Sequence, residues 1–388
     1  MIYFDNGATT YPKPACVRAA VMSYFSQYGA NPGRGGHDMS LATARQIYET
    51  RTKAAKLFGA KEPEHVVFTM NCTHALNAAI KGILQFGDHV IISDLEHNAV
   101  LRPVHGMAAQ GAITYTVVKA DLHSEENTVA AFRNAIRPNT KLIAVTHGSN
   151  VFGIKMPIEK LAAMSRLYGV YFLVDAAQTA GCEPIHMQNM GIDFLAVAGH
   201  KGLYGPTGTG LLITPHGEKL NTLMEGGTGS MSMEPFQPDF MPDRLEAGTV
   251  NTMGIIGLGA GLGFVLGMGV ENIARQEMKV ASAVYQNLSK IEEVILYTPK
   301  PQYGKSLPVI SFNVEGYTSE ETTALLNEKG FALRGGLHCA PLAHKKMGTE
   351  KIGTARVSIG AFNNCEQAVE LANAVKSFIA NKKKIELI

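Results

Sequence analysis

Short apolar runs rich in β-branched residues alternate with amphipathic segments from about His65 onward. A short apolar run bounded by turn-forming residues is typical of a buried strand. The predicted strands are His65–Thr69, His89–Ser93, Thr114–Lys119, Lys141–Thr146, Tyr171–Asp175, Phe194–Ala198 and Thr209–Ile213. Helical patterns lie between them, at Thr73–Leu84, Thr128–Ile136 and Ile158–Tyr168. This alternation predicts an α/β fold with a mostly parallel central sheet flanked by helices on both faces.

The pattern changes in the second half of the chain. Residues Gly226–Pro242 are rich in Gly, Ser, Met and Pro, show no periodicity, and are predicted to form a long functional loop. The uncharged, glycine-rich segment Gly254–Val270 predicts a buried helix, because it is short for a membrane span. Beyond it the predicted elements are helices at Asn272–Leu288, Ser319–Lys329 and Glu366–Ala380, and strands at Val309–Val314 and Arg356–Ile359. This mixture predicts a smaller α+β domain, in which Ser319 caps a helix.

Composition narrows the class of protein. The chain has 388 residues, of which 46% are hydrophobic and 18% charged, so a sizeable core is possible and disorder is disfavoured. The formal net charge of +2 gives no indication of a nucleic-acid partner. Five cysteines without a CxxC pair favour reduced thiols over a disulfide framework, and no Cys/His spacing indicates a metal site. Because the chain starts without a signal-peptide pattern, we expect a cytoplasmic location and no membrane partner.

An aspartate and a lysine follow two of the predicted strands. Asp175 ends the strand Tyr171–Asp175, and Lys201 follows Phe194–Ala198 within the run AGHKGLYGP. In open α/β sheets ligands bind at the carboxyl ends of the strands. The pair suits pyridoxal phosphate, because the lysine can form a Schiff base and the aspartate can keep the pyridine nitrogen protonated. The alternative is a surface lysine and a helix-capping aspartate, but the glycine framing of the pair favours the cofactor.

Other polar residues also stand at predicted strand ends. Cys72 and Thr73 open a helix whose N-terminus could hold a phosphate, although Thr73 could instead be an ordinary N-cap. His97 could stack on a pyridine ring, or it could be a loop histidine bonded to the main chain. Asn150 and Gln178 could donate to the phenolate oxygen of the cofactor.

The second region carries a candidate nucleophile. Cys339 lies on a glycine-rich loop and is flanked by Arg334 and His338, which could lower the pKa of its thiol. The alternative is a small apolar residue in a turn. Arg356 could pair with a substrate carboxylate, or it could be a surface arginine in a salt bridge.

These segments together resemble the class-V aminotransferase family of fold-type I pyridoxal phosphate enzymes, and within it the cysteine desulfurases and selenocysteine lyases. The resemblance runs from DNGATT at Asp5 to the segment that begins at Arg356, and is most specific in EHN, VDAAQ, GHK, EAGTVN and HC. The loop RGGLHC resembles the second type of desulfurase, which includes enzymes that act on cysteine and on selenocysteine. The fold implied is a large cofactor-binding domain of residues 15–258 and a small α+β domain of residues 1–14 plus 259–388 that carries the cysteine loop.

The resemblance implies a role for each matching residue around the cofactor. Lys201 would hold the cofactor covalently, Asp175 would pair with the pyridine nitrogen and His97 would stack on the ring. Thr73 and His200 would bind the phosphate. Gln178, Asn150 and Cys72 complete the expected cofactor-binding set.

The resemblance also implies a substrate site and a partner subunit. Thr249 would reach the phosphate of the neighbouring subunit, and Arg34 would line that site, which implies a homodimer with shared active sites. Arg356 would bind the substrate carboxylate, with Arg334 and Asn150 nearby.

The implied reaction removes sulfur from L-cysteine, gives L-alanine and leaves a persulfide on Cys339, from which a sulfur-acceptor protein takes the sulfur. Three alternatives stay open. They are a selenocysteine lyase, a class-V aminotransferase or epimerase that acts on another amino acid, and a binding protein that keeps the fold without activity.

Overall fold

The computed structural model describes residues 1–33 and 35–386, which fall into two compact units. The large unit comprises Lys13–His147 and Met156–Val270, and the small unit comprises Met1–Pro12, Gly148–Lys155 and the chain from Glu271 onward. Both units mix helices and strands, so the predicted α/β class is confirmed. The domain bounds expected from the sequence are residues 15–258 for the large domain and residues 1–14 plus 259–388 for the small one. These bounds stay a prediction.

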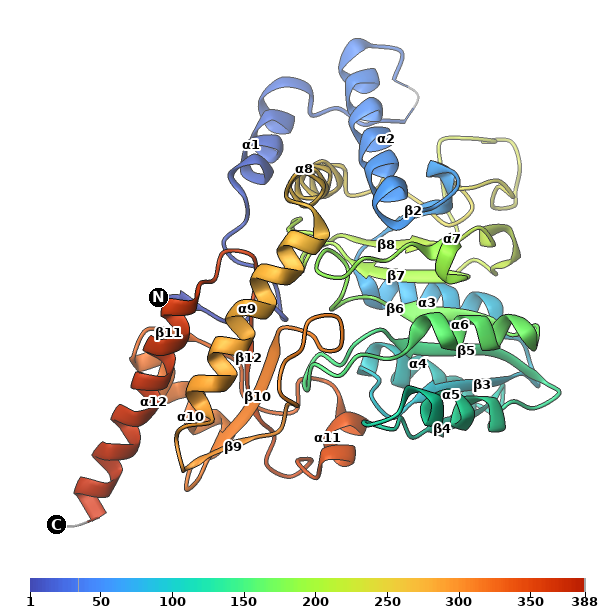
Figure 1. The fold of residues 1–388 in the computed structure, drawn as a ribbon. Coiled ribbons are helices and arrows are strands. Elements are labelled where there is room, and N and C mark those ends of the chain that lie inside the picture. Colours follow the sequence, from blue (N-terminus) through green and yellow to red (C-terminus); the bar gives the residue numbers. More distant parts are fainter. Residues whose placement is uncertain (34, 387–388) are drawn as a thin grey trace. The chain divides into compact units, whose positions relative to one another are not determined.

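A seven-stranded sheet forms the centre of the large unit, in the order β2-β8-β7-β6-β5-β3-β4 (Figure 1). The strands are β2 (Val66–Thr69), β3 (His89–Ser93), β4 (Thr114–Val118), β5 (Thr140–Thr146), β6 (Tyr171–Asp175), β7 (Phe194–Ala198) and β8 (Gly210–Ile213). Strand β8 is antiparallel to both of its neighbours, and all other neighbouring strands of this sheet are parallel. The predicted strands and the mostly parallel sheet are therefore confirmed. The central strands are mostly apolar because both faces of the sheet are covered.

Helices cover both faces of this sheet. In Figure 1, α5 and α6 lie in front of it and α3 and α4 behind it. Their bounds are α3 (Cys72–Ile83), α4 (Asn98–Ala109), α5 (Glu125–Asn134), α6 (Ile158–Leu167) and the short α7 (Met187–Met190). The side chain of Asn71, not of Thr73, caps α3 by accepting from the His74 N–H at 2.8 Å. Ser124 likewise starts α5 earlier than predicted, by accepting from the Asn127 N–H at 3.1 Å.

Three further helices of the large unit pack together. They are α1 (Ala15–Ser23), α2 (Asp38–Phe58) and α8 (Thr252–Met268), and the π-helix η1 (Tyr24–Tyr28) directly follows α1. The short 3₁₀ turns η2 (Pro63–His65) and η3 (Gly217–Lys219) complete this unit. Residues Gly226–Pro242 form the predicted loop, without helix or strand. Within the described chain no single helix has the length and apolar character to cross a membrane, and α8 meets that criterion only when combined with α9.

The small unit is built on two small sheets. Strand β10 (Val309–Val314) lies between β12 (Ala355–Ser358) and β9 (Val294–Leu296), and β1 (Ile2–Tyr3) pairs with β11 (Phe331–Ala332). Its helices are α9 (Val270–Leu288), α10 (Ser319–Glu328), α11 (Pro341–Met347) and α12 (Cys365–Glu386). Helix α10 is capped by Thr318, not by Ser319 as predicted. Thr318 and Glu321 form a reciprocal capping box that satisfies the N–H groups of both residues.

Candidate active site

Asp175 and Lys201 leave the same edge of the large sheet. Asp175 is the last residue of β6, is buried, and pairs in register with Ala196 of β7. Lys201 follows the end of β7, at Ala198. Because β6 and β7 are parallel neighbours, the acid and the lysine both stand at the carboxyl edge, where the sequence placed them.

The carboxylate of Asp175 has two donors. Its Oδ1 accepts from the Ala177 N–H at 2.9 Å and from the Cys72 thiol at 3.5 Å. Burial raises the pKa of the Cys72 thiol well above its ordinary value, and the charge of Asp175 adds to this, so the thiol stays protonated and donates. The side chain of Cys72 therefore faces Asp175. Phosphate binding by Cys72 stays a prediction, and it would involve the main-chain N–H of this residue.

Lys201 stands on a tight turn. The Tyr204 N–H donates to the Lys201 carbonyl at 2.7 Å, and the Gly205 N–H donates to the Gly199 carbonyl at 2.8 Å. A Cβ on Gly202 would lie 2.4 Å from the Ala180 carbonyl oxygen, so only glycine fits directly after the lysine. This close approach fixes the turn that carries Lys201 to the segment that follows β6.

Lys13 belongs to this site, although no role was predicted for it from the sequence. Its Nζ donates to the carbonyl of His200 at 2.7 Å, and burial lowers the pKa of Lys13 to about 8. Burial, followed by the charges of Lys201 and Lys13, lowers the pKa of His200 to about 4. His200 is therefore neutral near pH 7, and the positive charge of the two lysines makes this turn suitable for an anion.

Glu96 is a second residue that sequence reasoning missed. It is fully buried, its Oε1 accepts from the hydroxyl of Ser93 and from the Thr146 N–H, and its other oxygen has no hydrogen-bond partner among the described residues. Burial raises the pKa of Glu96 to about 8, and the charge of Asp175 contributes to the rise. Two signals in the sequence were available: Glu96 is a polar residue just after a predicted strand, and it belongs to the matching segment EHN.

His97, next to Glu96, caps helix α4. Its Nδ1 accepts from the Ala99 N–H at 3.0 Å, so in the neutral ring the proton lies on Nε2. This contact with the main chain fits the alternative stated above, in which His97 is a loop histidine bonded to the backbone. The stacking of His97 on a cofactor ring stays a prediction.

The remaining predicted residues of the large unit are less enclosed. Thr73 is exposed in the first turn of α3, and Gln178 is half-buried after β6. Thr249 is exposed and lines a cavity of about 410 Å³ together with Arg51 and Glu246. Arg34 lies outside the described residues.

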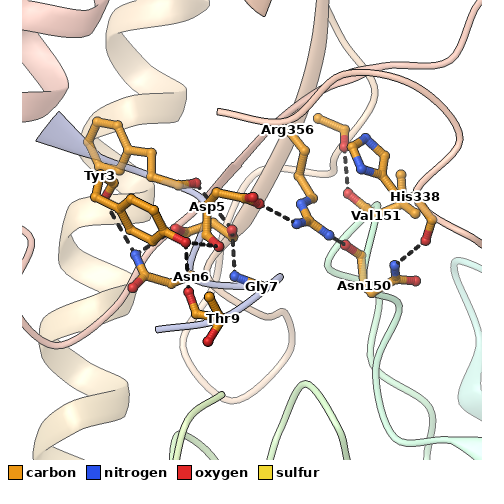
Figure 2. Close-up of polar contacts among 12 residues, drawn as sticks. Tyr3, Asp5, Asn6, Gly7, Thr9, Asn150, Val151, His338 and Arg356 are labelled. Atoms are coloured by element: carbon orange, nitrogen blue, oxygen red, sulfur yellow. Dashed lines mark hydrogen bonds and ion pairs between the residues drawn. The ribbon is translucent and has the colours of Figure 1, made fainter. Parts of the chain in front are cut away.

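The small unit places Arg356 in a buried polar network. Arg356 lies on β12 and is 1% exposed, which excludes the alternative of a surface arginine. Figure 2 shows its guanidinium between Asp5, whose Oδ1 accepts from Nη2 at 2.7 Å, and the carbonyl of Asn150, which accepts from Nη1 at 2.9 Å. Its Nε is buried without a hydrogen-bond partner among the described residues, and such a donor suits an incoming carboxylate.

Cys339 lies in the same unit and is exposed. It follows His338, whose carbonyl accepts from the side-chain amide of Asn150 at 2.8 Å. Arg334 is exposed, and its carbonyl accepts from the Arg356 N–H at 2.9 Å. The structure thus brings Asn150, Arg356 and the cysteine loop together, whereas the expected contact of Asn150 with a cofactor stays a prediction.

The chain is similar to known proteins over nearly its whole length. The profile of the aminotransferase class-V family matches residues 2–371. A probable cysteine desulfurase of Methanothermobacter thermautotrophicus is 33% identical over 376 residues, which cover 94% of this chain and 92% of the relative. A probable cysteine desulfurase of Synechocystis sp. is 32% identical over 95% of this chain and 88% of its own length.

Two solved structures are similar over nearly the whole chain. The cysteine desulfurase of Thermococcus onnurineus NA1 matches with a TM-score of 0.90 and 32% identity, covering 98% of this chain and 95% of that one. The cysteine desulfurase CsdA of Escherichia coli matches with a TM-score of 0.87 and 28% identity, covering 97% and 94%.

Proposed function

Because this chain belongs to the class-V aminotransferase family, we propose that it is a pyridoxal-phosphate-dependent cysteine desulfurase. The reaction converts L-cysteine to L-alanine and leaves the sulfur on Cys339 as a persulfide. The observation that carries the proposal is the link through Asn150 between a buried arginine suited to a carboxylate and the loop of an exposed thiol. Full-length similarity to cysteine desulfurases supports the same reaction.

The residues of the large unit fit pyridoxal phosphate. Asp175 offers a buried carboxylate whose Oδ1 accepts from the Ala177 N–H and the Cys72 thiol, and such a carboxylate can pair with a pyridinium. Lys201 offers an amine from a rigid turn, and the first turn of α3 offers N–H groups and the Thr73 hydroxyl to a phosphate. When bound, the cofactor supplies an electron sink that makes the Cα proton of an amino acid removable.

The side chains then divide the work. Arg356 binds the substrate carboxylate, and Asp5 and Asn150 hold its guanidinium in place. Asp175 holds a proton at the pyridine nitrogen, and Lys201 takes the proton from Cα as a general base. Lys13 donates to the carbonyl of His200 and so supports the turn that presents Lys201.

The sulfur step conserves atoms and electrons. The thiolate of Cys339 attacks the substrate sulfur, a sulfur–sulfur bond forms, and the carbon–sulfur bond breaks with its electron pair staying on the substrate carbon. Protonation of that carbon gives the methyl group of alanine. The thiol of Cys339 is thereby oxidised to a persulfide, and a thiol reductant or an acceptor protein removes the sulfur.

A homodimer with shared active sites is part of the proposal. Thr249 would then reach the phosphate bound by the partner, and its exposure in this chain is compatible with that role. The five free thiols agree with the reducing cytoplasm that a persulfide enzyme needs.

The experiment measures alanine and Cys339 persulfide from L-cysteine with a thiol reductant present. The parent protein and Cys16→Ala should both form alanine, because Cys16 is the other exposed cysteine and has no role in the reaction. Cys339→Ala should form none while it keeps the visible absorption of the bound cofactor. Alanine formation by Cys339→Ala at the parent rate would refute the role of Cys339.

The same assay with L-selenocysteine tests the second candidate. The short loop RGGLHC resembles the corresponding loop of enzymes that act on cysteine and of enzymes that act on selenocysteine. Selenium leaves carbon more readily than sulfur. A protein that forms alanine only from selenocysteine, also as Cys339→Ala, is a selenocysteine lyase and not a desulfurase.

A further inference from the structure

Asn150 makes two hydrogen bonds that point in different directions. Its main-chain carbonyl accepts from Arg356 Nη1 at 2.9 Å, and its side-chain Nδ2 donates to the carbonyl of His338 at 2.8 Å. Figure 2 shows Asn150 between the arginine and the histidine. All three residues are buried in the small unit, with Asn150 8% and His338 4% exposed. One residue therefore connects the candidate carboxylate-binding group to the cysteine loop.

The carbonyl that Asn150 holds belongs to the peptide bond between His338 and Cys339. The orientation of this peptide plane sets the direction in which the backbone enters Cys339. A bond to this carbonyl consequently acts on the position of the Cys339 thiol, although Asn150 does not contact the sulfur.

The backbone on both sides of this peptide is left-handed. His338 has a φ of 47° and Cys339 a φ of 58°, a conformation that residues with a Cβ rarely adopt. Two such residues in succession require restraints from their surroundings. The geometry at Cys339 is thus imposed on the loop and is not its intrinsic preference.

Two restraints act on His338. Asn150 holds its carbonyl, and its ring Nε2 hydrogen-bonds with the Thr354 carbonyl at 2.9 Å. Thr354 also donates its N–H to the carbonyl of Gly336 at 3.1 Å, and it precedes Arg356 by two residues. The residues that provide both restraints are therefore close to Arg356: Asn150 through a hydrogen bond, and Thr354 along the chain.

We propose that Asn150 is a positioning residue for Cys339 and couples the binding of a carboxylate at Arg356 to the placement of the thiol. A carboxylate that binds the guanidinium changes the donors available to the Asn150 carbonyl, and the side chain of the same residue transmits this change to the His338–Cys339 peptide. The coupling rests on one part of the proposed function, the binding of an amino-acid carboxylate at Arg356, and not on the release of sulfur. The restraint of the loop does not depend on it.

The first test is peptide-resolved hydrogen exchange of the full-length holoenzyme. Asn150→Asp keeps the shape of the side chain but removes the donor, and we expect roughly five- to tenfold faster exchange in peptides that cover residues 335–341. The matched control is Asn287→Asp, which makes the same chemical change at a donor to the Ala283 carbonyl on helix α9. Unchanged exchange at residues 335–341 in Asn150→Asp would overturn the restraint.

The second test separates positioning from structural support. In Asn150→Asp we expect the single-turnover rate of persulfide formation on Cys339 to fall at least about tenfold, with the KM for L-cysteine close to that of the parent. The main-chain carbonyl that contacts Arg356 is still present in this variant. A raised KM with an unchanged persulfide rate would instead assign Asn150 to substrate binding and overturn the proposal.

The third test measures the coupling with L-alanine, which carries the carboxylate but cannot give sulfur. Saturating L-alanine should slow exchange at residues 335–341 in the parent and leave it unchanged in Asn150→Asp. An equal effect of L-alanine in both proteins would overturn the coupling. If L-cysteine yields no alanine but L-alanine still protects the parent loop, the desulfurase proposal fails while the coupling stands.

Discussion

The thiol of Cys72 lies 3.5 Å from the carboxylate of Asp175, at the first turn of helix α3. The raised pKa of the thiol keeps it protonated, so it donates to the acid that we assign to the pyridine nitrogen. A hydrogen bond to a charged group contributes about 1.5–3 kcal/mol, so Cys72→Ala should lower kcat by roughly tenfold or more. Cys72→Ser retains a donor and should stay near the parent.

The measurement is the initial rate of alanine formation at saturating L-cysteine, together with the cofactor absorption as a function of pH. Cys182→Ala is the matched control, because Cys182 is also a buried free thiol but donates to main-chain carbonyls. Parent values of both quantities in Cys72→Ala would show that this contact does not support Asp175.

Because the pKa of Lys13 is lowered, we expect the rate of alanine formation to fall at alkaline pH. Its pKa of about 8 lies below the ordinary 10.5, so the folded protein loses this charge as the pH rises through about 8. The ammonium donates to the His200 carbonyl and so holds the turn that carries Lys201, and we expect the rate to fall above that pH because the uncharged amine is a weaker donor. Lys13→Arg should move the fall to higher pH, and Lys13→Met should be slow at every pH.

The pH–rate profiles of the three proteins test this prediction. Lys155→Met is a suitable control, because Lys155 also donates to a main-chain carbonyl, that of Gly304, but at an exposed position. An alkaline limb at the same pH in the parent and in Lys13→Arg would assign that limb to another group.

The central sheet was predictable from the sequence because its strands are buried on both faces. Such strands are short apolar runs, and their ends located Asp175 and Lys201 correctly. Helix α2 was not predicted. It begins at Asp38 after an unusual cap, His37, and its buried face mixes apolar side chains with Thr43, Thr50 and Arg51, which weakens the apolar pattern.

Contacts between distant parts of the chain account for what the sequence did not reveal in the site. Asn150 stands just after β5, as the cofactor residues of other strands do, but its amide binds His338, 188 residues away. Lys13 meets the carbonyl of His200 over a separation of 187 residues. Neither pairing leaves a local pattern, so only the fold shows them.

Glu96 predicts a specific dependence of stability on pH. Its pKa is raised from 4.5 to about 8, so between these values the unfolded chain loses a proton that the folded chain keeps. The folded state therefore binds more protons, and this group lowers the free energy of unfolding by about 1 kcal/mol per pH unit as the pH rises from about 4.5 to 8. Above about 8 its contribution no longer changes.

Glu96→Gln should remove this slope. Denaturant unfolding at pH 5, 6, 7 and 8 should show the variant gaining stability relative to the parent with each step. Glu96→Ala should be less stable than Glu96→Gln at every pH, because it leaves the buried Thr146 N–H without its acceptor. Parallel curves for the parent and Glu96→Gln would mean that Glu96 is ionised in the folded protein.

Arg51 and Glu246 form a buried ion pair that holds the segment of Thr249. Two bonds of 2.8 and 2.9 Å join the guanidinium to the carboxylate, the side chains are 7% and 8% exposed, and Glu246 also accepts from the Phe68 N–H. Removing one partner leaves the other charge buried and unpaired, which costs about 3–5 kcal/mol. We therefore expect Glu246→Ala to lower the free energy of unfolding by about that amount.

The exposed pair of Lys160 with Glu126 provides the control, since it has a similar distance of 2.7 Å but side chains that are 48% and 75% exposed. Water screens this pair, so Glu126→Ala should change stability by no more than about 1 kcal/mol. Denaturant unfolding of the two variants at one pH compares the buried pair with the exposed one, in which Lys160 also keeps Glu125 as a second partner at 2.7 Å. Equal losses in both variants would show that the Arg51–Glu246 pair is solvated in the folded protein, and the hold on the Thr249 segment would then have to come from its other contacts.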